Sequence, residues 1–125
     1  MKYMLMFAGS EEYFDTFKSF PEEEQRKALA KVGAWSKEHS AAGRLLESNA
    51  LQPVSTATTV RINPFTGKAL VTDGPFIDAK ERIGGYAIIE VPGLDEAIQL
   101  AKSWPAGGTV EIRPLAAIPA EMSAS

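Results

Sequence analysis

The chain has 125 residues, the length of one domain, and its 45% apolar and 23% charged residues are typical of a globular protein rather than a disordered chain. Its 13 lysines and arginines against 16 aspartates and glutamates give a net charge of −3, which argues against a nucleic-acid partner. The lack of cysteine excludes disulfides and thiolate metal sites, and the single His39 cannot build a histidine metal cluster. We therefore expect no metal and no cofactor.

Residues 1–10 combine a lysine with an apolar run that loosely resembles an export signal. The run is only six residues long, and Glu11 and Glu12 follow it, so we interpret it as a buried first strand. No stretch of the sequence is long and apolar enough to span a membrane. We expect a cytoplasmic protein without a membrane partner.

A helix is predicted after a polar and aromatic connection over residues 11–20. Ser19 stands at a capping position, and Pro21 and Glu22 suit a first helical turn. Gly43 is a typical helix stop. Between these ends, apolar or aromatic residues recur at helical spacing, at Ala28, Val32, Trp35 and His39.

The rest of the chain alternates strands with a short second helix. The helix begins at Leu94 and ends before Pro105, and Asn63–Gly67 predicts the loop of a hairpin. Strands are predicted over residues 44–51, 58–62, 68–72, 83–91 and 109–113. Residues 1–113 are expected to form one domain, and residues 114–125 a loosely held tail.

This order of elements predicts an α+β fold, a ferredoxin-like sandwich with helices on one face of one sheet. Alternation along the strands would point the aliphatic side chains toward the helices. The opposite face would then carry a mixture of charged and aromatic side chains, namely Arg61, Tyr86, Glu90, Glu111 and Arg113. Such a face is neither a core nor a plain solvated surface, so it predicts a dimer interface, a ligand cleft, or both.

The sharpest local feature is the break Asp73-Gly74-Pro75 between two strands. Pro75 fixes its own φ and restricts Gly74, and an aspartate before glycine can accept hydrogen bonds from nearby amides, which explains Asp73 as a turn residue. Alternatively, this backbone holds Asp73 at the mouth of a cleft, where partial burial would raise its pKa and make it a general acid or base. The sequence leaves both interpretations open.

Two further features have structural interpretations. Gly84-Gly85 leads into a strand instead of linking a strand to a helix, so it is not a dinucleotide fingerprint and predicts a bulge or a close approach of backbones. His39 shares the helical stripe of Trp35, which favours a structural role near the helix end.

Several segments together resemble the DGPF-domain branch of the YCII-related family. The resemblance covers nearly the whole chain, through residues 2–8, 42–46, 58–61, 71–76, 80–81, 84–86, 94–97 and 110–114. It implies a ferredoxin-like fold that dimerises by sheet-to-sheet packing, the dimeric α/β-barrel arrangement. Some DGPF relatives are encoded beside sigma factors of the extracytoplasmic-function type, which implies a regulatory association.

The wider family includes small-molecule enzymes, among them a dehydrochlorinase acting on a chlorinated hydroxyquinol. A histidine near the start of the first helix, paired with an aspartate, has been proposed as the family's active site. This chain has Gln25, Arg26 and Lys27 in that region, so only the aspartate of the pair has a counterpart, Asp73.

We predict a homodimeric small-molecule-binding protein. If it is also an enzyme, Asp73 would be the acid or base, and the reaction would be elimination, isomerisation or hydrolysis of a small polar or aromatic substrate. Arg61 or Arg113 would hold an anionic group, Tyr86 would donate a hydrogen bond, and Glu90 would complete the ligand-binding face. The competing hypothesis is a non-catalytic interaction or regulatory module, in which a partner takes up the sheet face and Asp73 only shapes a loop.

Overall fold

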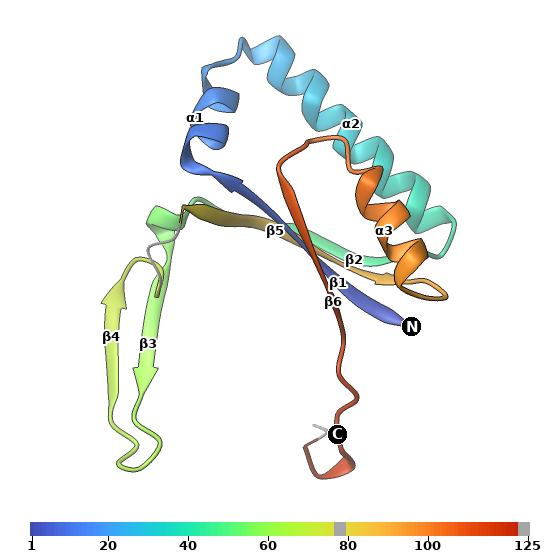
Figure 1. Cartoon of the computed structure of the whole chain (residues 1–125). Coiled ribbons are helices and arrows are strands. Elements are labelled where there is room, and N and C mark those ends of the chain that lie inside the picture. Colours follow the sequence, from blue (N-terminus) through green and yellow to red (C-terminus); the bar gives the residue numbers. More distant parts are fainter. Residues whose placement is uncertain (77–79, 123–125) are drawn as a thin grey trace.

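The computed structural model describes residues 1–76 and 80–122. The described chain is a mixture of helices and antiparallel strands, which confirms the predicted α+β class (Figure 1). Its elements are β1 (Lys2–Ser10), α1 (Glu11–Ser19), α2 (Glu22–Ala41), β2 (Leu45–Ala50), β3 (Thr58–Ile62), β4 (Ala69–Asp73), β5 (Glu81–Glu90), α3 (Leu94–Lys102) and β6 (Thr109–Pro114), with short 3-10 turns at Val54–Thr56 and Ala120–Met122.

Four strands form the main sheet in the order β2-β5-β1-β6, and all neighbouring strands in it are antiparallel. Both α2 and α3 cover one face of this sheet (Figure 1). The expectation of one sheet that includes the hairpin is wrong, because β3 and β4 pair with each other in a separate two-stranded sheet. The 3-10 turn after Pro53 and the break at Gly74, whose φ is 92°, lead the chain out of the main sheet and back into it.

The core lies between the main sheet and the two helices. Leu5 of β1 and Ile89 of β5 are fully buried there, and Trp35 of α2 and Leu100 of α3 pack over them. Burying an aliphatic side chain of this size contributes roughly 1.5–3 kcal/mol. The aliphatic sides of β1 and β5 therefore face the helices, as the alternation predicts.

The opposite face of the main sheet, called here the helix-free face, carries the mixed set of side chains that the alternation predicts for these strands. Its centre is apolar, because Met4 of β1 lies across from Ile88 of β5, and Met6 follows on the same side of β1. Charged and aromatic residues surround this centre, with Arg113 across from Met4, Glu111 and Tyr86 across from Met6, and Glu90 across from Lys2.

The predicted connection over residues 11–20 is wrong, because residues 11–19 form α1. Ser10 caps this helix, as its side-chain oxygen accepts a hydrogen bond from the Tyr13 amide at 3.0 Å. Ser19 does not cap α2. It ends α1 and donates its hydroxyl to the Thr16 carbonyl, and α2 begins after Pro21 without a side-chain cap.

Candidate functional site

A cavity of about 750 Å³ lies between α1, α2 and one end of the main sheet. This volume is in the range of small-molecule sites. Seven aromatic side chains line it, namely Phe7, Tyr13, Phe14, Phe17, Phe20, Trp35 and Trp104, whereas Tyr86 borders it with its ring on the opposite face of the sheet. We call it the aromatic cavity.

Three aromatic rings in mutual contact form its inner wall. Phe7 stacks on Trp104 with ring centroids 3.9 Å apart, and the Trp35 ring meets both edge-on at 6.2 and 5.1 Å. The Trp35 indole N–H donates to the Ser103 hydroxyl at 2.8 Å, which in turn donates to the Leu100 carbonyl at 2.6 Å. The hydrogen bonds and ring contacts hold both tryptophans of the chain in fixed orientations.

Helix α1 forms the opposite wall, and glycines allow it to approach the sheet. The Tyr13 ring lies over Gly9, since a Cβ there would be 2.5 Å from the ring, and its hydroxyl donates to the Ala106 carbonyl. The Phe14 ring lies over Gly84, where a Cβ would be 3.0 Å from Cζ. A larger side chain at either glycine would push α1 away from the cavity.

Gly84-Gly85 shows both features that the sequence predicts for it. Phe7 pairs with Gly85 and Ala8 with Ile83, so Gly84 is the extra residue of a bulge. A Cβ on Gly85 would lie 3.0 Å from the Asn49 carbonyl oxygen, which is a close approach of two backbones. The bulge therefore shapes the end of the sheet that borders the cavity.

The cavity is almost without charge. Of the described residues that line it, only Glu12 carries a charge, and Glu12 is exposed. Ser36 of α2 and Ser48 of β2 also line it, and within the described chain neither hydroxyl has a hydrogen-bond partner. An anion would find no cation here to offset its desolvation, whereas a neutral molecule has apolar walls and free hydroxyls.

The site residues predicted from the sequence lie in two places. Tyr86, Glu90 and Arg113 lie on the helix-free face, where the Tyr86 hydroxyl donates to Glu47 at 2.5 Å and accepts from the Asn49 side-chain amide at 3.0 Å. Asp73 and Arg61 belong to the β3–β4 hairpin, so within one chain the five residues are not gathered at one point.

Asp73 ends β4 and is exposed rather than partly buried. Its carboxylate has no hydrogen-bonding or ionic partner in the described chain. The break that follows it is held from β3, because the Thr59 hydroxyl donates to the Gly74 carbonyl at 2.6 Å and the Arg61 guanidinium to the Phe76 carbonyl at 3.1 Å. The Gly74 amide donates to the Ala57 carbonyl at 2.8 Å, so backbone and β3 side chains define this turn.

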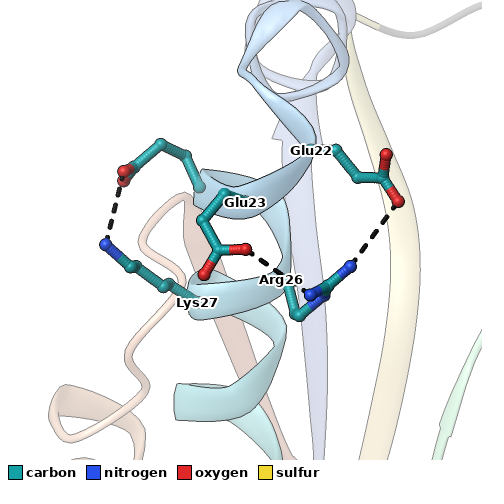
Figure 2. Close-up of polar contacts among 5 residues, drawn as sticks. Glu22, Glu23, Arg26 and Lys27 are labelled. Atoms are coloured by element: carbon teal, nitrogen blue, oxygen red, sulfur yellow. Dashed lines mark hydrogen bonds and ion pairs between the residues drawn. The ribbon is translucent and has the colours of Figure 1, made fainter.

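The start of α2, where the family's proposed histidine would lie, holds surface ion pairs. Arg26 pairs with Glu22 at 3.7 Å and with Glu23 at 3.5 Å, and Lys27 pairs with Glu24 at 3.6 Å, as Figure 2 shows. These side chains are 57–90% exposed, so each pair contributes little to stability. Gln25 donates to the carbonyls of Lys18 and Phe20 and joins α2 to α1.

His39 lies at the end of α2 and has the structural surroundings that its stripe predicts. Its ring is buried and meets the Trp35 ring edge-on, with the ring centroids 5.0 Å apart. Its Nδ1 accepts a hydrogen bond from Arg44 Nε at 3.1 Å. Burial lowers the pKa of His39, the Arg44 charge lowers it further, and Glu38 partly opposes both. Nε2 is 3.5 Å from a Glu38 oxygen, in a geometry that makes no hydrogen bond.

The described residues contain no group of three histidine, cysteine, aspartate or glutamate side chains arranged to hold a metal ion. Among the helices of this described part, none is both long and apolar enough to cross a membrane.

Sequence reasoning missed the aromatic cavity, because it treated residues 11–20 as a connection. One signal for it was available, since Tyr13, Phe17 and Phe20 recur at steps of four and three. That spacing places aromatic rings on one face of a helix.

Comparison with known proteins shows to which family the chain belongs. The model of the YCII-related domain matches residues 1–118. The chain belongs to the YCII-related family. An uncharacterised protein of Rhizobium meliloti (strain 1021) is 32% identical over an alignment of 102 residues, and this alignment covers 78% of this chain and 81% of the relative. The YCII-related match spans β1 to β6, and so includes every element that surrounds the aromatic cavity.

Proposed function

We propose that this YCII-related protein is a homodimer that binds a small uncharged aromatic molecule in the aromatic cavity. The observation that carries the proposal is a chamber of about 750 Å³ lined by seven aromatic side chains. Ring contacts of this kind contribute about 0.5–1.5 kcal/mol each beyond the burial of area. The free hydroxyls of Ser36 and Ser48 would orient a polar substituent on the ring.

The dimer is proposed to form through the helix-free faces, in the dimeric α/β-barrel arrangement of the DGPF branch. The strand order β2-β5-β1-β6 supports it, since this is the order of a ferredoxin-like sandwich. Met4, Met6 and Ile88 would form the apolar centre of the interface. We also propose a cytoplasmic location, which the cysteine-free composition suits.

Binding without catalysis is favoured for a single chain, because the exposed Asp73 lies outside the cavity. An Asp73 acid or base acting with Arg61, Tyr86, Glu90 and Arg113 would require residues from two subunits. The alternative role, a regulatory module without an active site, is supported by the placement of Asp73 and Arg61 on a hairpin that stands apart from the main sheet.

A titration followed by NMR tests the ligand class, because the only two tryptophans of the chain both line the cavity. We expect 2-naphthol, which is neutral at pH 7, to shift the indole N–H signals of Trp35 and Trp104. The anion 2-naphthoate has the same ring system and should bind at least about tenfold more weakly, since its charge has no cationic partner.

Two matched substitutions on α2 control this experiment. Ala28 lines the cavity, and Ala28→Phe should fill part of it and weaken 2-naphthol binding. Ala30 is exposed on the same helix, so Ala30→Phe should leave the affinity unchanged. Indole signals that stay in place at saturating 2-naphthol, or equal effects of the two substitutions, would contradict the proposal.

A further inference from the structure

The β3–β4 hairpin presents an apolar face that the described chain leaves uncovered. Val60 pairs with Val71 and Ile62 with Ala69, so these four side chains share one face. Val60, Val71 and Ile62 are 52%, 61% and 65% exposed. A two-stranded hairpin is marginally stable alone in water, so an apolar face of this kind indicates a partner.

The direction of the hairpin indicates where that partner lies. In Figure 1 the hairpin and the segment that follows β6 both extend to the side of the main sheet opposite α2 and α3. The helix-free face lies on this same side, between them. The segment after β6 adds exposed apolar side chains there, at Leu115, Ile118 and Met122. Any molecule that packs on the helix-free face would therefore be flanked by the hairpin.

A second copy of the chain fits these features. Its helix-free face offers the apolar centre of Met4, Met6 and Ile88, and a two-fold dimer would apply the same contact twice. The helix-free face carries three glutamates against two cations, at Glu47, Glu90, Glu111, Lys2 and Arg113, and the hairpin loop carries the cation Lys68. Arg61 lies on the other face of the hairpin, across from Leu70.

We propose that the β3–β4 hairpin is an arm that packs against the second subunit, an inference that rests on the proposed homodimer. The arm has a consequence for the site, because Asp73 pairs with Thr58 and lies on the same hairpin face as Val60 and Val71. Its carboxylate, unpartnered in the described chain, would then lie at the boundary between subunits. The arm would thus bring Asp73 to the second subunit, where Glu90 and Arg113 of the partner subunit lie on the adjoining face.

Photo-crosslinking between subunits tests the arm, and the absence of cysteine makes a single introduced thiol unique. Ile62→Cys is labelled with benzophenone maleimide, mixed with ¹⁵N-labelled unmodified chain, and irradiated. We expect crosslinks from residue 62 to peptides of the ¹⁵N-labelled chain. Ala34→Cys, on the exposed side of α2, is the control and should give no crosslink between subunits.

A second measurement uses the dimer dissociation constant from dilution in the ultracentrifuge. Val60→Asp on the apolar hairpin face should raise this constant at least about tenfold, whereas Thr66→Asp in the hairpin loop should not. A stable dimer whose residue 62 crosslinks only within its own chain would overturn the arm and leave the dimer intact. A monomer at all concentrations would overturn the dimer as well, while 2-naphthol binding to the cavity would remain a separate result.

Discussion

The surroundings of His39 show how burial sets the chemistry of one side chain. Only 7% of the residue is exposed, and its Nδ1 accepts from Arg44, so the proton of the neutral ring is on Nε2. A second proton would place a charge in this buried position beside the Arg44 guanidinium. The lowered pKa of His39 follows from these two costs, which outweigh the attraction of Glu38.

The lowered pKa of His39 predicts how the stability of the protein depends on pH. The unfolded chain holds a histidine of ordinary pKa, about 6.5, so below that pH it binds more protons than the folded chain. The contribution of His39 to stability is therefore complete above about pH 6.5 and is lost as pH falls toward the folded pKa. We expect the urea-derived free energy of unfolding to fall less between pH 7.5 and pH 5 in His39→Gln than in the unmodified protein. Equal pH dependence of the two proteins would contradict this account.

At the level of elements, the break that follows the β3–β4 hairpin is defined by the backbone geometry of Gly74 rather than by the side chain of Asp73. Gly74 has a φ of 92°, a region that favours glycine, and its amide and carbonyl are both hydrogen-bonded to residues beside β3 or within it. The Asp73 carboxylate makes no hydrogen bond or ion pair in the described chain.

Two substitutions separate the roles of these neighbours. Gly74→Ala should destabilise the protein by about 1–2 kcal/mol, because an L side chain is strained at this φ. Asp73→Asn should change the free energy of unfolding by less than about 0.5 kcal/mol, as expected for an exposed side chain without partners. Urea denaturation of both variants measures this. If Asp73→Asn proves as destabilising as Gly74→Ala, Asp73 itself maintains the turn.

At the scale of the whole molecule, the main sheet has two different faces. One packs on α2 and α3 and ends in the aromatic cavity, whereas the helix-free face remains open in a single chain. Binding and dimerisation are thus assigned to opposite sides of the sheet. The two properties should be separable by substitution.

Met4→Asp tests that separation. Met4 lies across from Arg113, so in a single chain the Arg113 charge would compensate the new carboxylate. In the proposed dimer the interface would bury this carboxylate, which is costly. We expect the dimer dissociation constant to rise at least about tenfold while the affinity for 2-naphthol stays unchanged. Light scattering and the NMR titration measure the two effects. Loss of both properties together would mean that the cavity depends on the dimer.

Local pattern predicted much of the fold. The hairpin strand 58–62 was predicted with its observed bounds, and the other strands and α3 within one or two residues, because alternation and turn residues act over short range. The wrong assignment of residues 11–20 shows the limit. Tyr13 and Phe14 form a helix wall only because Gly9 and Gly84 let their rings approach the sheet.

The sequence by itself determined the α+β class, the alternation of the helix-free face and the resemblance to the YCII-related family. Only the tertiary structure decided that the hairpin leaves the main sheet, that Asp73 and Arg61 go with it, and that an aromatic cavity opens beneath α1. The reason is physical. Periodicity is encoded residue by residue along the chain, whereas a strand's partner and the space between packed elements depend on contacts between segments far apart in sequence.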